Sequence, residues 1–144
     1  PSASLPLAAR NPTVLADRAY ILEQLGSQSI VFLDARTPEE YSGATIRAAR
    51  GGHIPGAVNL NWLDTMDRNR NLRLKPAELL NETLSALGVR PEQEVITYCQ
   101  SHHRSAHAWL MLKSLGFSRV RGYAGSWSEW GNDPSVPITT GTSA

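Results

Sequence analysis

Runs of consecutive apolar residues alternate along this chain with stretches in which apolar residues recur every three or four positions. The run at residues 30–33 is short and rich in β-branched side chains, which is typical of a strand buried on both faces of a parallel sheet. Further strands are predicted over residues 57–60, 94–98 and 119–122. Helical spacing predicts helices over residues 18–25, 76–87 and 104–115. Strands that alternate with helices predict an α/β fold, with a mainly parallel central sheet flanked by helices.

Helix start and stop signals support these assignments. Asp17 is suited to cap the first helix, which should end at Gly26. Thr37 and Pro38 are typical of the N-cap and first residue of a further, short helix with an acidic first turn. Gly88 is expected to end the helix over residues 76–87.

The chain ends differ in composition from its middle. Residues 1–12 are rich in Pro, Ser and Ala and are predicted to be a linker or tail, and residues 138–144 a C-terminal tail. Residues 13–137 are predicted to form one domain, which is long enough to bury a core without disulfides or a metal. Because the chain opens on Pro, we expect it to be a processed or excised piece of a longer protein.

Charge and cysteine content limit the partners and the compartment. The chain has 14 Lys and Arg against 13 Asp and Glu, so its formal charge of +1 gives no reason to expect nucleic acid or an anionic membrane as a partner. Its uncharged stretches are shorter than the ~20 residues that cross a bilayer. The single cysteine cannot form an internal disulfide. We therefore expect a cytoplasmic protein, although the composition also fits the periplasm.

The single cysteine, Cys99, lies where the predicted strand over residues 94–98 passes into the helix over residues 104–115. A loop of this kind directs backbone N–H groups inward and, with the positive end of the helix dipole, forms an anion-binding site. A thiol placed there should be acidified and exposed. The alternative is a buried cysteine that acts only as a small apolar side chain.

Polar and cationic residues fill the loop after Cys99. Arg104 can bind a sulfonate or carboxylate with its planar fork of donors, or can hold the loop in shape. Ser105 can cap the following helix or donate its hydroxyl to the sulfur, and capping is the more common role. His102 and His103 are expected to line the mouth of the pocket and to recognise an anionic donor when protonated.

A metal site is the alternative interpretation of the residues around Cys99. Four residues close in sequence could bind a metal: Cys99, His102, His103 and His107. The usual zinc spacings are missing, since there is no second cysteine and no helical HExxH pattern. We expect no metal and no other cofactor.

Asp34 and Arg36 follow the strand over residues 30–33 and should face the same edge of the sheet as Cys99. Asp34 can accept hydrogen bonds from Arg36 or from loop backbone, as part of a structural polar network. Arg36 can instead contact a donor anion. Both residues are therefore candidates for the substrate site.

The segment Tyr98-Cys99-Gln100-Ser101-His102-His103-Arg104-Ser105 resembles the active-site loop of the rhodanese family of sulfurtransferases. Asp34-Ala35-Arg36 with residues 38–43, Gly52-His53-Ile54-Pro55-Gly56-Ala57, Gly116-Phe117 and residues 123–131 resemble further family segments, in family order. The resemblance covers residues 14–137 and is strongest to the C-terminal catalytic half of two-domain thiosulfate sulfurtransferases.

The resemblance implies a thiosulfate sulfurtransferase that carries sulfur as a persulfide on Cys99. The partners would be a small anionic sulfur donor, a thiol or cyanide acceptor, and an N-terminal rhodanese-like domain outside this chain. Cys99 and Arg104 would be the catalytic residues. The residues expected to contact substrate are Gln100, Ser101, His102, His103, Ser105, Arg36 and Asp34.

Two departures from the family pattern affect the expected substrate. Family members often carry Gly at the position of His102, and His restricts the backbone if a positive φ is needed there. Enzymes that use mercaptopyruvate usually carry a second substrate arginine four residues after Arg36, where this chain has Glu40. This departure argues against mercaptopyruvate, which stays an alternative donor.

Two other classes of function stay open. Cysteine-dependent phosphatases and arsenate reductases also set a thiolate against N–H donors and close the loop with Arg, but the phosphatases place five residues between Cys and Arg, whereas here four residues separate Cys99 from Arg104. The smaller loop favours a sulfur or sulfonate over a phosphoryl group. Rhodanese-like modules also serve as non-enzymatic sulfur-relay or interaction domains, and the presence of Cys99 and Arg104 argues against an inactive copy.

Overall fold

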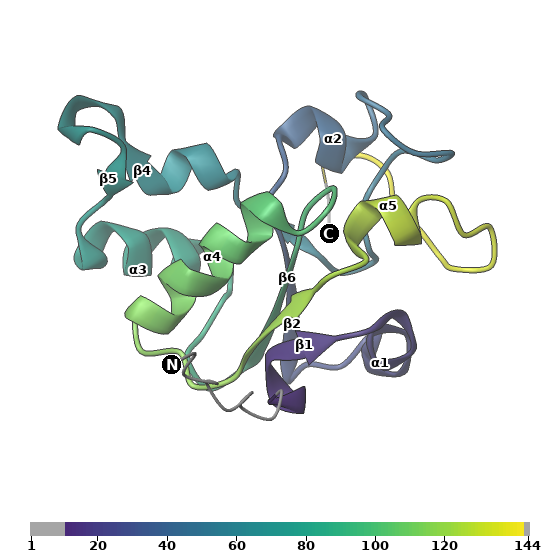
Figure 1. Ribbon diagram of the computed structural model, residues 1–144, viewed down its shortest axis with the longest axis horizontal. Coiled ribbons are helices and arrows are strands. Elements are labelled where there is room, and N and C mark those ends of the chain that lie inside the picture. The colour runs from purple at the N-terminus through teal and green to yellow at the C-terminus, as the bar shows by residue number, and fades with distance from the viewer. Residues whose placement is uncertain (1–10, 143–144) are drawn as a thin grey trace, which may run out of the picture.

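The computed structural model describes residues 11–142 of the chain. Within these residues a central sheet has five strands in the order β1-β7-β6-β2-β3, all parallel (Figure 1). The strands are β1 Leu15–Ala16, β2 Ile30–Asp34, β3 Val58–Asn59, β6 Glu94–Tyr98 and β7 Val120–Tyr123. The predicted α/β architecture with a mainly parallel sheet is confirmed.

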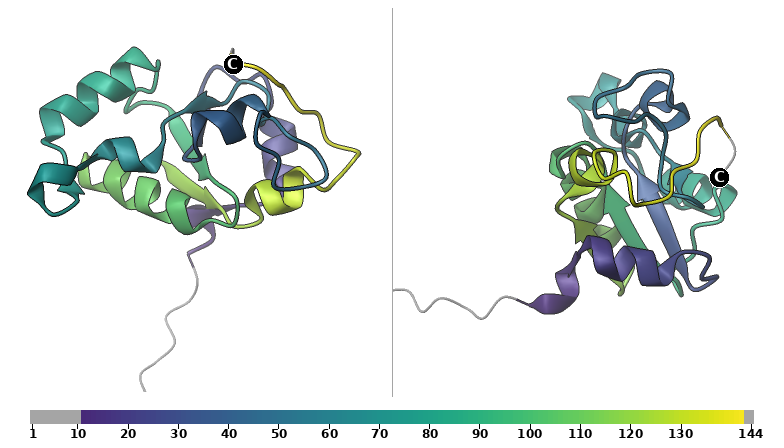
Figure 2. Two further views of the ribbon diagram at one scale, coloured as in Figure 1. Left: turned by 90° about the horizontal axis from the view of Figure 1, so that it is seen from above. Right: turned by 90° about the vertical axis from the view of Figure 1, so that its right-hand side faces the viewer.

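Helices cover both faces of this sheet (Figures 1 and 2). They are α1 Arg18–Gln24, α2 Pro38–Ser42, α3 Ala77–Ala86, α4 His103–Ser114 and α5 Ser126–Trp130. Short 3-10 turns form at Pro12–Val14, Trp62–Thr65 and Arg68–Arg70. A small antiparallel hairpin, β4 Met66–Asp67 and β5 Arg73–Leu74, lies beside the main sheet.

Two apolar cores form because successive side chains of a strand point to opposite faces. Leu33 and Val95 belong to the core on the face covered by α3 and α4, together with Leu84 and Met111. Their neighbours Phe32, Ile96 and Tyr98 belong to the other core, with residues of α1, α2 and α5. Every residue of β6 is buried, as its continuous apolar pattern predicts for a central strand.

Local side-chain contacts fix where α1 and α2 begin. The Asp17 carboxylate accepts a hydrogen bond from the Tyr20 N–H at 2.8 Å. Thr37 and Glu40 form a capping box, in which each side chain accepts from the backbone N–H of the other. The predicted starts of both helices are confirmed.

The ends of the described chain are attached to the domain. Arg121 Nη1 of β7 donates to the Pro12 carbonyl at 3.3 Å, whereas most of the predicted linker, residues 1–10, lies outside the described residues. In the predicted tail, Thr139 exchanges two backbone hydrogen bonds with His53, at 2.8 and 2.9 Å. Between residues 11 and 142, no helix has the length and hydrophobicity that crossing a bilayer requires.

Candidate active site

Cys99 follows β6 directly and therefore lies at the carboxyl edge of the parallel sheet, where open α/β sheets bind ligands. The start of α5 fixes its backbone from both sides. The Cys99 N–H donates to Ser126 Oγ at 3.3 Å, and the Cys99 carbonyl accepts from the Trp127 N–H at 2.8 Å. Ser126 holds this position with a φ of 50°. Nothing in the sequence distinguished Ser126 as a partner of Cys99.

The Cys99 loop, residues 99–105, is held on its far side as well. The Gln100 carbonyl accepts from the Ser128 N–H at 2.9 Å. The Gln100 side-chain amide donates to the Arg47 carbonyl at 3.0 Å. The loop is thus bonded to α5 and to the segment between α2 and β3, both distant in sequence.

The exposure expected of Cys99 is wrong, because the residue is only 1% exposed. Cys99 belongs to the same buried apolar cluster as Ala108 and Met111 of α4. Yet the sulfur has a polar partner, since Ser105 Oγ donates to Cys99 Sγ at 3.4 Å. Cys99 is therefore a buried cysteine whose sulfur is hydrogen bonded, which neither of the two interpretations of the sequence described.

The backbone of the Cys99 loop leaves N–H donors without a protein acceptor among the described residues. Within residues 11–142, no backbone N–H group of residues 100–105 donates to another residue. The first N–H groups of a helix lack partners inside the helix, and α4 begins at His103 without a side-chain cap. These groups and the helix dipole make the end of α4 favourable for an anion. None of these N–H groups donates to Cys99 Sγ in the described part of the chain, where the sulfur is bonded by the Ser105 hydroxyl, so anion binding by the loop stays a prediction.

Arg104 is bound by an acidic side chain from α2. Its Nη1 and Nη2 donate to the two carboxylate oxygens of Glu40, at 2.6 and 2.9 Å. Glu40 is 2% exposed, and its carboxylate also lies 3.3 Å from Nε of the exposed Arg47. The structural role considered for Arg104, a tether that holds the loop, is therefore directly visible.

Opposing effects act on the Glu40 carboxyl group. Burial raises its pKa, but the hydrogen bonds from Arg104 and from the Thr37 backbone, with the charges of Arg104 and Arg36, lower it by more. The pKa of Glu40 is thus below its ordinary value. The same pairing raises the pKa of Arg104.

Replacing Glu40 by Gln is expected to lower the free energy of unfolding by about 1–3 kcal/mol near neutral pH, because the partly exposed arginines lose their anion but keep some solvent. Since the folded-state pKa of Glu40 is lowered, its contribution is present above the ordinary glutamate pKa and is lost as the pH falls through the folded-state value. Urea unfolding of wild type and Glu40→Gln, measured at a series of decreasing pH values, should show that the difference in their free energies of unfolding shrinks.

The exposed neighbour Glu39 provides a matched control for this prediction. Glu39→Gln should change the free energy of unfolding by no more than about 0.5 kcal/mol. If Glu40→Gln and wild type differ by the same amount at every pH, the ion pair is not the source of the stability.

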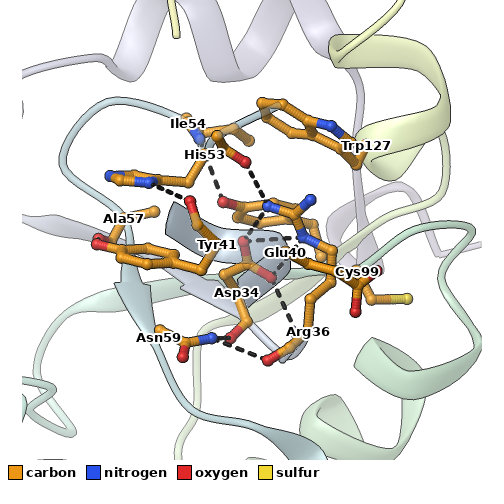
Figure 3. A network of polar contacts seen from close by, with 12 residues as sticks. Asp34, Arg36, Glu40, Tyr41, His53, Ile54, Ala57, Asn59, Cys99 and Trp127 are labelled. Atoms are coloured by element: carbon orange, nitrogen blue, oxygen red, sulfur yellow. Dashed lines mark hydrogen bonds and ion pairs between the residues drawn. The ribbon is translucent and has the colours of Figure 1, made fainter. Parts of the chain in front are cut away.

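Asp34 and Arg36 form a buried ion pair, in which the Arg36 Nε and Nη2 donate to the Asp34 carboxylate at 2.6–3.0 Å (Figure 3). The two side chains are 0% and 1% exposed. Arg36 also donates to the Gly52 carbonyl at 2.7 Å, and its guanidinium lies 4.5 Å from the ring centre of Trp127. The Cys99 sulfur points away from this network in Figure 3.

These contacts correct the expectation that Asp34 and Arg36 bind substrate. Every donor of Arg36 named above faces a protein acceptor or a ring, so the side chain has no face turned to solvent. The Asn59 amide adds bonds to the carbonyls of Asp34 and Arg36, at 3.1 and 2.9 Å. The pair joins β2 to β3 and to the turn at Gly52, which is the structural network considered for Asp34.

Ser101 and His103 lie at the surface of the loop. Both are exposed, and Ser101 Oγ is 3.2 Å from His103 Nδ1. His107, on the next turn of α4, is half-buried, and its ring meets Trp62 edge to face. Burial lowers the pKa of His107. In the described part of the chain, no group of three or more His, Cys, Asp or Glu residues is arranged to hold a metal ion.

His102 and Ser105 depart from their expected positions. His102 is the N-cap residue of α4, with a φ of 66°, and its ring packs over Gly122 of β7 instead of lining the pocket mouth. Ser105 is not the cap: it lies one turn further on and is fully buried. Its hydroxyl contacts the Cys99 sulfur and lies 2.7 Å from His102 Nδ1. The less favoured role for Ser105, donation to the sulfur, is the one observed.

Comparisons with known proteins agree with this geometry. A family model described as a rhodanese-like domain matches residues 17–133. A thiosulfate sulfurtransferase of Azotobacter vinelandii is 46% identical over 144 residues, covering 95% of this chain and 52% of the relative. One from Pseudomonas aeruginosa is 49% identical over 123 residues, covering 85% of this chain and 45% of the relative. The chain thus spans about half the length of these curated relatives.

A solved structure of EanB with a cysteine persulfide, in a tetrahedral intermediate state with ergothioneine, is similar as well. It superposes with a TM-score of 0.84 at 26% identity, covering 98% of this chain and 36% of that one. The likeness therefore extends over nearly the whole of this chain, and over about a third of EanB.

Proposed function

We propose, because this chain belongs to the rhodanese-like domain family, that it moves a sulfane sulfur from thiosulfate to cyanide or a thiol through a persulfide on Cys99. The observation that carries the proposal is the position of Cys99, which follows a central strand and precedes the start of α4, where the first N–H groups have no partner within residues 11–142. The two curated relatives named thiosulfate sulfurtransferase, at 46% and 49% identity, support it.

The first half-reaction loads the protein with sulfur. The Cys99 thiolate attacks the outer sulfur of thiosulfate, a sulfur–sulfur bond forms, and the original sulfur–sulfur bond breaks with its electron pair leaving on sulfite. The persulfide that remains carries a negative charge on its terminal sulfur. The N–H groups of residues 100–105 are suited to stabilise that charge as well as the starting thiolate.

The second half-reaction returns the protein to its starting state. Cyanide, or the thiolate of an acceptor, attacks the terminal sulfur and forms thiocyanate or an acceptor persulfide. The electron pair of the broken bond returns to Cys99. No electrons enter or leave the system in total, so this cycle needs no redox cofactor.

The residues of the loop are proposed to divide the remaining roles. Ser101 and His103, exposed beside the loop, contact the anionic donor, and Gln100 fixes the loop to the Arg47 carbonyl. Arg104 acts with Cys99 by adding positive charge near the sulfur while Glu40 holds its side chain. Because Cys99 is buried, entry of the donor requires a local shift of the loop.

The contacts of Arg104 weigh against the competing phosphatase function. A phosphatase loop uses its arginine fork to bind the phosphoryl oxygens. Here both outer nitrogens of Arg104 bind Glu40, so the fork is occupied. Glu40 places a negative charge there, which also disfavours the carboxylate of mercaptopyruvate.

The test is a side-by-side assay of thiosulfate, mercaptopyruvate and p-nitrophenyl phosphate. We expect thiocyanate from thiosulfate and cyanide, slower turnover of mercaptopyruvate, and no p-nitrophenol. Release of p-nitrophenol without thiocyanate would overturn the proposal in favour of a phosphatase. A persulfide that forms from thiosulfate but is not turned over by cyanide or thiols would identify a non-enzymatic sulfur-relay module.

The cellular setting is proposed on two grounds. A catalytic thiolate stays active in a reducing compartment, so we propose that the protein acts in the cytoplasm. Since the chain spans about half of its curated relatives, we propose that it works beside a second rhodanese-like domain.

A further inference from the structure

A chain of hydrogen bonds leads from the Cys99 sulfur to the imidazole of His102. Ser105 Oγ is 3.4 Å from Cys99 Sγ and 2.7 Å from His102 Nδ1. Ser105 is fully buried, so protein groups rather than bulk solvent surround its hydroxyl. The Thr97 hydroxyl donates to the Ser105 carbonyl at 3.0 Å and fixes the Ser105 backbone.

Two features of the chain hold the His102 ring in this place. Its backbone φ of 66° lies in the left-handed region, which is unfavourable for a side chain with a Cβ. Across from it, β7 has Gly122, where an added Cβ would lie 2.4 Å from His102 Cε1 and Nε2. The ring therefore lies directly on the Gly122 backbone. A structural role alone does not require a histidine here, because glycine fits this φ better.

The surroundings of His102 contain few charges. Val14 and Leu15 near the N-terminus and Ala106 and Trp109 of α4 line, with the imidazole, a hollow of about 200 Å³. On its own loop, His103 acts electrostatically on the His102 ring, and β7 presents Gly122 to the ring. Burial, and to a smaller extent the charge of His103, lower the pKa of His102. The Cys99 sulfur, at the other end of the hydrogen-bond chain, interacts electrostatically with the Arg104 guanidinium.

A neutral imidazole can set the direction of both hydrogen bonds. With the proton on Nδ1, His102 donates to Ser105 Oγ, and the only proton of the hydroxyl then points to the sulfur. The sulfur in that arrangement is an acceptor, so the arrangement suits a thiolate or the anionic end of a persulfide. With the proton on Nε2, both bonds run the other way, from a thiol through Ser105 to Nδ1.

Ionisation of Cys99 connects the two arrangements. The thiol proton moves to Ser105 Oγ, the hydroxyl proton moves to His102 Nδ1, and Nε2 of the partly exposed ring releases its proton to solvent water. One proton leaves in total, the thiol becomes a thiolate, and the imidazole ends neutral as it began. The buried sulfur thereby loses its proton without direct contact with solvent.

We propose that His102 is a positioning residue for sulfur transfer, which acts through the Ser105 hydroxyl to hold the Cys99 sulfur as an anion. The inference rests on the proposed function. The hydrogen bond from Ser105 favours the anion in both half-reactions, because the terminal sulfur of the persulfide and the returning thiolate are negatively charged. His102 selects the direction of that bond.

The test compares His102→Gly, Ser105→Ala and the double variant. Since Cys99 is the only cysteine, the far-ultraviolet thiolate absorbance, after subtraction of a Cys99→Ser titration, reports this residue alone. Gly at position 102 keeps the positive φ and removes only the ring. We expect a smaller thiolate fraction at neutral pH in both single variants, and persulfide formation slower by roughly 10- to 100-fold. The double variant should show no larger fall in the thiolate fraction, or in the rate of persulfide formation, than Ser105→Ala alone.

Two further variants separate positioning from structure. His102→Asn tolerates the backbone conformation and can offer an N–H to Ser105, so it should restore part of the thiolate fraction. His107→Asn changes the same residue type on the same helix, where the ring packs on Trp62, and should leave the titration unchanged. Circular dichroism checks that each variant is folded.

The results distinguish this inference from the proposed function. The proposed role of His102 is wrong if the Cys99 thiolate of His102→Gly titrates like that of wild type. It is also wrong if the effects of the two single variants on the thiolate fraction add in the double variant. Either result holds even where wild type forms a persulfide. If wild type forms no persulfide from thiosulfate, the proposed function fails. The absorbance titration uses no sulfur donor and still decides whether His102 acts on Cys99.

Discussion

Replacing Cys99 by Ser is expected to abolish thiocyanate formation from thiosulfate and cyanide, a loss on the order of 10⁶-fold. A serine hydroxyl is not ionised near neutral pH and cannot hold a transferable sulfur as a persulfide. The chain has no other cysteine that could take over. The measurement is a steady-state thiocyanate assay, with sulfite release followed in parallel.

The fold provides a control for this loss. Serine has nearly the shape of cysteine and can still accept the hydrogen bond from Ser105, so Cys99→Ser should change the free energy of unfolding by about 1 kcal/mol or less. Loss of activity with the melting curve retained would assign the effect to the sulfur. Thiocyanate formation by folded Cys99→Ser at more than a trace of the wild-type rate would show that the chemistry occurs elsewhere.

Replacing Asp34 by Asn is expected to lower the free energy of unfolding by about 3–5 kcal/mol, the largest effect on stability that the structure predicts. The Arg36 guanidinium is 1% exposed, and without the carboxylate it becomes an uncompensated buried charge. Its bonds to the Asp34 carboxylate are replaced by weaker contacts with an amide. Urea unfolding followed by tryptophan fluorescence measures the change.

A second variant tests whether the charge causes this effect. The double variant Asp34→Asn with Arg36→Met removes both charges, and it should recover part of the stability lost by Asp34→Asn alone. Normal stability of Asp34→Asn combined with a raised KM for thiosulfate would contradict the account. It would mean that Arg36 turns to the substrate after all.

The parts of the fold that depend on neighbouring residues could be predicted from the sequence. β2 and β6 were visible as continuous apolar runs because both of their faces are buried. The helix starts at Asp17 and Thr37 were visible because each cap acts within three residues of itself. β1 and the hairpin β4–β5 were missed, since strands of two residues are too short to show a period. β3 is equally short and was predicted because it follows the Pro55-Gly56 turn.

The sequence predicted which residues belong to the candidate site better than it predicted the contacts that those residues make. The order of Cys99, its loop and α4 follows from the sequence, whereas anion binding at the start of α4 stays a prediction. The partner of Arg104 could not be predicted, because Glu40 lies 64 residues earlier and only the sheet topology brings it there. The same holds for Ser126, which is 27 residues from Cys99.

Burial explains the main errors. Cys99 was expected to be exposed because its flanking residues are polar, yet α4 and α5 bind the loop from two directions. Arg36 was a candidate for the substrate site as well as a possible partner of Asp34, and the structure shows the pairing with Asp34, two residues away. The sequence shows which side chains are polar, but whether they are exposed to solvent or bonded to each other depends on the fold.

The most direct test of the central claim is the intact mass of the protein after incubation with thiosulfate carrying a labelled outer sulfur. The account predicts a gain of one labelled sulfur atom on Cys99, its removal by cyanide as thiocyanate, and no gain in Cys99→Ser. An unchanged mass of the folded wild-type protein, or a label that stays in Cys99→Ser, would contradict it.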